Sequence, residues 1–204
     1  MPTARADQKE ATRQRLLTVA RRHFEAHGFE GANLRAIGAE AGVSAASVIV
    51  HFTDKRELLH ASLFADLEET INGALQGIGP GRLGNQLHAL TEAVFAYYLR
   101  RPALSRTLLK EALFAQGPWA ERFTAQVARV HGRVAELFVA AAARSKVRLQ
   151  PDDALVFGAA WFSFYYFALL GWVQGANPQP LRMVDRMVAQ HLRGILPRSE
   201  WRTR

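Results

Sequence analysis

The chain has 204 residues, of which 49% are hydrophobic and 22% charged, proportions that predict a folded globular protein and exclude a disordered one. It contains no cysteine, which excludes disulfides and thiolate metal sites and fits a reducing, cytoplasmic location. The net charge of +8 permits a nucleic-acid partner. Residues 1–60 hold 9 Lys+Arg and 7 Asp+Glu, a difference of +2, whereas residues 82–148 hold 11 and 4, a difference of +7. Charge alone therefore does not locate a DNA site. No apolar stretch precedes Leu16, so no secretory signal is expected.

Apolar residues recur at helical spacing almost throughout the chain, which predicts an all-α fold. The first helix is expected over about 10–27, with Gly28 ending it. Asn33 is expected to cap a short helix that runs to about Ala41, and Ser44 a second one over 45–51. Asp54, followed three residues later by Glu57, predicts the start of a longer helix to about residue 76.

The glycine- and proline-rich segment 77–81 is the strongest break in the sequence, and we expect the domain boundary near it. Prolines mark the starts of most of the later helices, where this residue is tolerated. These helices are predicted near 83–100, 102–115, 118–145, 152–174 and 180–195. Residues 197–204 are expected to be frayed.

The segment 33–52 combines two short predicted helices with a tight turn at Gly42 and Val43. This arrangement is typical of a helix-turn-helix, whose second helix can enter a major groove. Ala45, Ala46 and Ser47 form the first turn of that helix. Small side chains there allow the helix to lie deep in the groove, with apolar contact to a thymine methyl group and a hydroxyl for a base edge.

Four residues around this helix could contact DNA phosphates, namely Arg35, Ser44, His51 and Lys55. The backbone N–H groups where helices begin at Ser44 and Lys55 would add donors. Other interpretations remain open: solvated surface charge for Arg35 and Lys55, a capping or packing role for His51, and a purely structural helical hairpin for the whole segment.

Residues 10–70 resemble the DNA-binding domain of the TetR (tetracycline-repressor) family. The resemblance rests on a spaced set of residues: Thr12-Arg13, Leu16-Leu17, Ala20, Phe24, Gly28-Phe29, Ile37, Ala41-Gly42-Val43-Ser44, His51-Phe52, Lys55 and Glu57-Leu58-Leu59. It implies a three-helix DNA-binding domain over 10–70, and a domain of about six helices over 71–204 for effector binding and dimerisation. It also implies a ligand-responsive repressor that binds a palindromic DNA operator as a homodimer, without a cofactor.

One position departs from the family pattern. The family usually has a tyrosine, which contacts a phosphate, where this chain has Ile49. Loss of that hydroxyl costs about 1 kcal/mol if nothing replaces it, so weak or unusual operator affinity is expected. Asn33 stands where threonine is common, and asparagine also caps helices. The expected DNA-binding residues are Asn33, Arg35, Ser44, Ala45, Ala46, Ser47, Ile49, His51 and Lys55.

Residues 154–173 contain no charged side chain, which meets the length rule for a membrane span. Ser163, Tyr165 and Tyr166 lie in the middle of the run, and Asp152 and Asp153 rather than basic residues precede it. A helix buried on all sides has the same composition. The resemblance to the TetR family implies that this helix takes part in dimerisation and also lines the effector site, and no membrane contact is expected.

Aromatic side chains of the C-terminal half predict an apolar effector cleft with few polar groups. Its expected residues are Phe95, Tyr98, Phe114, Trp119, Phe123, Trp161, Phe164 and Tyr165. The expected dimer contacts are Phe157, Ala160, Trp161, Phe164, Val184, Val188 and His191. Satisfied core or surface positions remain the alternative for each.

The alternatives to a DNA-binding regulator are an enzyme, a helical interaction module and a membrane-associated protein. The sequence has no nucleophile elbow, phosphate-binding glycine loop or zinc-protease motif, so an enzyme is not expected. His23 and His27 stand four residues apart and could bind a metal, but their place in a last helical turn favours a polar role, and no metal site is expected. A helical interaction module without DNA binding, or a membrane-associated protein, is the remaining alternative.

Overall fold

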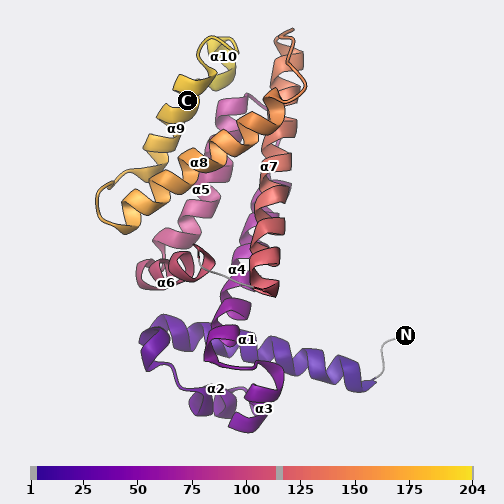
Figure 1. Ribbon diagram of the computed structural model, residues 1–204, viewed down its shortest axis with the longest axis vertical. Coiled ribbons are helices and arrows are strands. Elements are labelled where there is room, and N and C mark those ends of the chain that lie inside the picture. Colours follow the sequence, from indigo (N-terminus) through magenta and orange to yellow (C-terminus); the bar gives the residue numbers. More distant parts are fainter. Residues whose placement is uncertain (1–3, 114–116, 204) are drawn as a thin grey trace. The chain divides into compact units, whose positions relative to one another are not determined.

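The computed structural model describes residues 4–113 and 117–203, and the regular elements in these ranges are helices (Figure 1). They are α1 (Ala4–Gly31), α2 (Leu34–Glu40), α3 (Ala45–His51), α4 (Lys55–Gln76), α5 (Leu83–Leu99), α6 (Pro102–Leu113), α7 (Pro118–Arg144), α8 (Asp153–Val173), α9 (Pro180–Leu192) and α10 (Arg198–Trp201). The predicted all-α fold is confirmed.

The ends of the helices near the turn motif follow the predicted caps. The Asn33 side chain accepts a hydrogen bond from the Arg35 backbone, and Ser44 accepts one from Ser47. At the start of α4, the Glu57 N–H donates to Asp54 Oδ1 at 2.7 Å. α1 begins at Ala4, before the expected start near residue 10, and Gly28 (φ 68°) interrupts the helix where its end was expected, with one more turn to Gly31.

The chain forms two compact units, and α6 belongs to the first. This unit comprises the residues up to Glu68 together with α6, and the second comprises residues 69–100 and the chain from α7 onward. A single division between residues 70 and 81 was expected. The difference has a physical reason: α6 packs against α1, and Arg101 just before it pairs with Glu25 at 2.7 Å and with Asp66 at 2.7 Å.

Within the second unit, α8 packs against both α7 and α9, and α5 contacts α7 and α9. Gly158 marks the close approach of α8 to α7, since a Cβ there would lie 2.7 Å from the His131 carbonyl oxygen. The small size of Gly158 thus lets α7 of the same chain approach α8 closely.

The C-terminal end is held by a buried carboxylate, so the expected fraying of residues 197–204 is wrong for α10. Glu200 is 9% exposed and accepts hydrogen bonds from the Leu83 N–H at 3.2 Å and from Arg144 at 2.9 Å. Gly84 lets the backbone of Trp201 approach α5, because a Cβ at Gly84 would lie 2.7 Å from the Trp201 carbonyl oxygen. Glu200 thus supplies the acceptor that the first turn of α5 needs.

We predict that Glu200→Gln lowers the free energy of unfolding at pH 7 by about 1–2 kcal/mol. Burial acts to raise the pKa of the Glu200 carboxyl, but the hydrogen bonds from Arg144 and Leu83 outweigh it and hold the pKa below its usual value of 4.5. The stabilisation is therefore complete above pH 4.5 and is lost as the pH falls through the folded-state pKa.

Urea unfolding at pH 7 and at about pH 3 measures this, and the gap between wild type and variant should shrink in acid. Glu136→Gln is the matched control, since this carboxylate pairs with Arg133 on the same helix but its side chain is 68% exposed. It should cost less than about 0.5 kcal/mol. An equal effect of the two substitutions would contradict the proposed anchoring of α10.

Candidate nucleic-acid interface

The turn between α2 and α3 is built on one close backbone approach. The Val43 N–H donates to the Gly38 carbonyl at 2.8 Å, and Gly42 adopts a positive φ of 74° that suits glycine. A Cβ at Gly38 would lie 3.0 Å from the Val43 carbonyl oxygen and 3.1 Å from Val48. The sequence alone did not single out Gly38, and Ala41 nearby is also buried. The position of Gly38 one helical turn before Gly42 was the available sign.

This approach fixes which face of α3 is exposed. Val48 is fully buried against the first unit, with 0% exposure. Ala46 lies on the opposite face and is exposed, flanked by Ile49 at 47% and Val50 at 76% exposure. Sequence reasoning included Ala46 and Ile49 but not Val50, which is the most exposed large apolar residue of this helix.

The polar residues at the start of α3 also lie at the surface. Ser44 is exposed, and its hydroxyl lies 3.0 Å from that of Ser47, which is half-buried like Ala45. Asn33 and Arg35 of the preceding helix are exposed too. The structure therefore brings the small first turn of α3 and its capping residues to one accessible region.

His51 closes α3 in a partly buried position. Its Nδ1 atom is buried and has no hydrogen-bond partner within the described part of the chain. Burial, with the positive charges of Lys9 and Arg13, lowers the pKa of His51 below 6.5. The imidazole is therefore neutral at pH 7, and any contact that it makes to a phosphate is a hydrogen bond without a full positive charge.

Lys55 has a structural contact that the sequence did not suggest. Its ammonium donates to the Glu30 carbonyl at 3.0 Å and lies 4.8 Å from the centre of the Phe29 ring. It thus ties the end of α1 to the start of α4. A phosphate contact by Lys55 stays a prediction, and its ammonium would have to contact the phosphate in addition to, or in place of, the Glu30 carbonyl.

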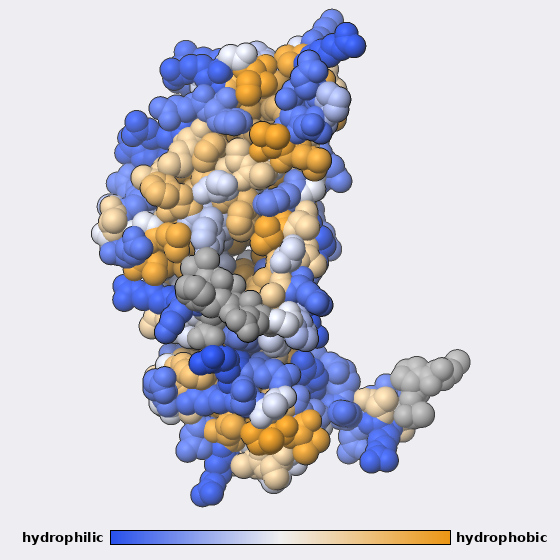
Figure 2. Space-filling model, viewed as in Figure 1, coloured by the Kyte–Doolittle hydropathy of each residue, from blue (hydrophilic) through white to orange (hydrophobic). Residues whose placement is uncertain are grey.

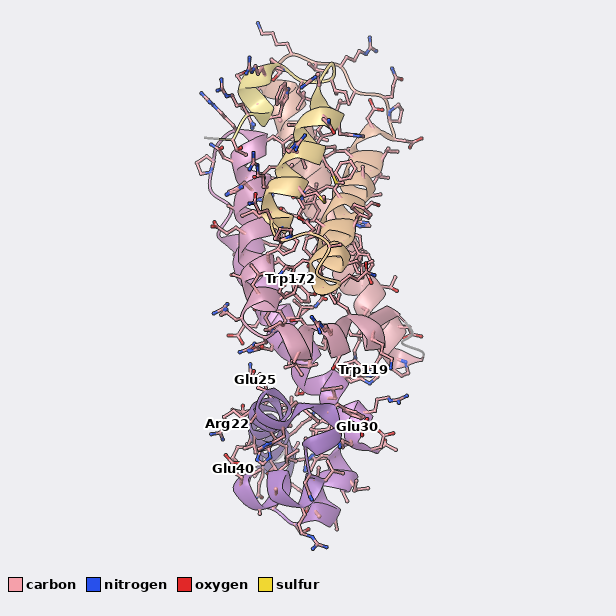
Figure 3. All side chains as sticks on the ribbon, turned by 90° about the vertical axis from the view of Figure 1, so that its left-hand side faces the viewer. Arg22, Glu25, Glu30, Glu40, Trp119 and Trp172 are labelled. Carbon is pink, nitrogen blue, oxygen red and sulfur yellow. The ribbon has the colours of Figure 1, made fainter. Side chains whose placement is uncertain are left out.

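A second tie joins α1 to α2. Glu40 accepts from His23 at 2.7 Å and pairs with Arg22 at 2.7 Å, and Figure 3 shows the Arg22 and Glu40 side chains near one another. The hydrogen bond from His23 and the nearby positive charge of Arg22 lower the pKa of the Glu40 carboxyl against its desolvation. His23 thus has a polar role here, as its position in the helix favoured.

Four of the expected effector residues meet in the second unit. The Tyr165 ring lies 5.3 Å from that of Phe95 and 5.7 Å from that of Trp161, and its hydroxyl is hydrogen-bonded to Tyr98. Burial raises the pKa of Tyr98 to about 12, so both hydroxyls are neutral. Nε1 of Trp161 is buried without a hydrogen-bond partner in the described ranges.

The other described effector candidates, Phe164, Trp119 and Phe123, lie on α8 and at the start of α7. Phe164 lies against His191, with ring centres 5.7 Å apart. Trp119, labelled in Figure 3, and Phe123 lie in the first turns of α7, where the Arg122 guanidinium is 4.7 Å from the Trp119 ring. Phe114 lies outside the described residues.

Several expected dimer residues lie in the core of the chain itself. The exposure of Phe157, Trp161, Val184 and Val188 is only 1–3%, because α8 packs against α7 and α9 of the same chain. These four side chains offer no surface to a second copy. Ala160, Phe164 and His191 are half-buried. The exposed apolar residues of α8 are instead Leu155, Val156 and Phe167.

Comparison with known proteins finds similarity to bacterial transcriptional regulators. A family model described as "Bacterial regulatory proteins, tetR family" matches residues 16–62. The chain is 28% identical to the HTH-type transcriptional repressor Rv1474c of Mycobacterium tuberculosis over 95% of this chain and 99% of that protein. It is 39% identical to the HTH-type transcriptional repressor AcnR of Corynebacterium glutamicum over 30% of this chain and 32% of that protein.

Solved structures support the same fold. A TetR transcription regulator from Haloarcula marismortui is similar over 92% of this chain and 100% of that one, with a TM-score of 0.72 and 17% identity. A putative tetR-family regulator from Mesorhizobium loti is similar over 93% of this chain and 98% of that one, with a TM-score of 0.68 and 17% identity.

We predict that Gly38→Ala destabilises the first unit by about 1–3 kcal/mol, because the added methyl group would lie only 3.0 Å from the Val43 carbonyl oxygen and 3.1 Å from Val48. Gly73→Ala is the control, since it lies in α4 with open space around its Cβ position and should be neutral or stabilising. Thermal unfolding with hydrogen exchange on α2 and α3 measures both. Equal stability of the two variants would contradict the close approach.

Proposed function

Since the chain belongs to the tetR family of bacterial regulatory proteins and is a DNA-binding transcriptional regulator, we propose that it is a ligand-responsive repressor that binds a palindromic operator as a homodimer. The observation that carries this proposal is the outward face of α3, where Ala46 is exposed opposite the fully buried Val48. A helix presented in this way can enter a major groove. Repression, rather than activation, is supported by the relative from M. tuberculosis, which is named a repressor.

A homodimer is supported by the surface of α8. Leu155, Val156 and Phe167 are 65%, 59% and 60% exposed, and a band of apolar residues crosses this part of the molecule in Figure 2. α8 is also long and apolar enough to cross a membrane, with 33% of its apolar window buried in the chain. A second copy covers such a face in a DNA-binding protein and gives the two-fold symmetry that a palindrome requires.

An uncharged effector is supported by the cluster around Tyr165. Its aromatic rings, its neutral tyrosine hydroxyls and the unpaired N–H of Trp161 suit an apolar molecule that carries a hydrogen-bond acceptor. Such a ligand would act by favouring one separation of the two α3 helices over another. A coupling of about 1–3 kcal/mol would change operator affinity by about 5- to 150-fold. We place this activity in the cytoplasm, where the DNA is.

We predict that Phe167→Asp separates the dimer and weakens operator binding. A charge at this exposed position should leave the protomer folded but oppose burial of the α8 face. The operator is first obtained by selection from a random-core duplex pool with the wild-type protein. It should contain two half-sites about 10–10.5 base pairs apart, or a multiple of that spacing.

Sedimentation equilibrium gives the state of assembly, and a mobility-shift titration gives the affinity. Leu99→Asp is the control, because Leu99 is 45% exposed on α5 and lies outside the proposed interface. A Phe167→Asp protein that stays dimeric would move the interface elsewhere, and a wild-type monomer bound to a single half-site would overturn the dimeric proposal.

We predict different salt responses for two phosphate candidates. Arg35→Gln removes a full charge and should flatten the log-log dependence of operator affinity on salt by about 0.9 for each lost phosphate contact. His51→Gln should leave that slope unchanged at pH 7.5, because the lowered pKa keeps the imidazole neutral there. An equal loss of slope in both variants would show that His51 binds as a cation.

A further inference from the structure

The outward face of α3 is apolar across its whole width. At about 100° per residue, Ala46 lies nearly opposite the buried Val48, with Ile49 and Val50 on its two sides. Ile49 is 47% and Val50 76% exposed. In Figure 2, apolar residues reach the surface in the region of α2 and α3. Water therefore covers aliphatic side chains at the centre of the surface that faces DNA.

The same helix lacks the side chains that read purines by paired hydrogen bonds. α3 has the sequence Ala-Ala-Ser-Val-Ile-Val-His. Arginine or lysine usually reads guanine, and asparagine or glutamine usually reads adenine. None of these residue types occurs in α3. The two serines at its start, Ser44 and Ser47, accept and share hydrogen bonds in the cap, and serine discriminates weakly between bases.

A major groove offers one group that suits this apolar face, the C5 methyl of thymine. When a methyl group displaces water from exposed aliphatic side chains, the free energy of the complex falls. The face is continuous with the capped turn that enters the groove, so duplex DNA, rather than another protein, is the occupant that the geometry favours.

We propose that Ile49 and Val50 are specificity-determining residues that read thymine methyl groups, so that the operator half-sites carry thymines where α3 enters the groove. The proposal rests on the operator binding inferred above and adds to it the chemistry of the bases that are read. It also gives Ile49 a role of its own, in place of the phosphate contact expected from a tyrosine there.

The test uses the selected operator duplex and the full chain. Each thymidine of a half-site is replaced in turn by deoxyuridine, which removes the methyl group and keeps the base pair. At the positions under α3, each replacement should weaken binding about four-fold, and a symmetric pair of replacements about fifteen-fold. Replacing the same thymidine by deoxycytidine should weaken binding, and 5-methyldeoxycytidine should recover a large part of the loss.

Two variants assign the effect to its residues. Ile49→Ala and Val50→Ala should each bind the thymidine duplex more weakly, and at least one position should lose its sensitivity to deoxyuridine in each variant. Both residues are exposed, so unfolding temperatures should stay at the wild-type value. Val139→Ala is the matched control, because Val139 is 47% exposed but lies on α7. It should keep the full sensitivity to deoxyuridine.

The outcomes distinguish failure of the methyl-reading proposal from failure of operator binding. A wild-type protein that selects an operator but binds its deoxyuridine form equally well overturns the reading of methyl groups and leaves operator binding intact. A sensitivity to deoxyuridine that survives in both alanine variants also overturns the assignment to Ile49 and Val50. Failure to enrich any duplex would overturn operator binding itself, and this proposal with it.

Discussion

The contact of Gly38 with the Val43 carbonyl is the constraint on which the function of the first unit depends. It sets the distance between α2 and α3 and so the rotation of α3, which buries Val48 and turns Ala46 outward. A DNA-reading helix must be held rigidly, because a rotation by one residue would replace its reading face with a different set of side chains. The ties from Lys55 to Glu30 and from His23 to Glu40 hold the helices that carry this pair.

The parts predicted well from the sequence are those fixed by local chemistry. The caps at Asn33, Ser44 and Asp54 act within three residues, so the sequence identified the starts of α2, α3 and α4. The anchoring of Glu200 to Leu83 joins residues 117 positions apart, and no local pattern predicts such a contact. The pairing of Arg101 with Glu25 and Asp66 is non-local in the same way. It places α6 with the first unit rather than the second.

The candidate residues of α8 show another limit. A helix that is apolar on every side has no periodic pattern that separates a core face from an interface. The sequence therefore assigned Phe157 and Trp161 to a dimer contact, while packing against α7 and α9 buries them in the protomer. The same packing leaves Leu155 and Phe167 exposed. The position of the neighbouring helices decides which residues of α8 are buried in the protomer and which are exposed.

Charge and apolar contact have separate consequences for DNA binding by this chain. Residues 1–60, which contain the helix-turn-helix, have a difference of only +2 between basic and acidic residues. Phosphate contacts bind all sequences alike, and a nearly balanced domain has a weaker long-range attraction to DNA than a strongly basic one. An apolar face on α3 contributes favourable binding free energy only where a base offers a methyl group. Weak attraction to phosphates keeps the affinity for random DNA low, while contact with thymine methyl groups raises the affinity for the operator. The two properties together favour discrimination between DNA sequences over tight binding.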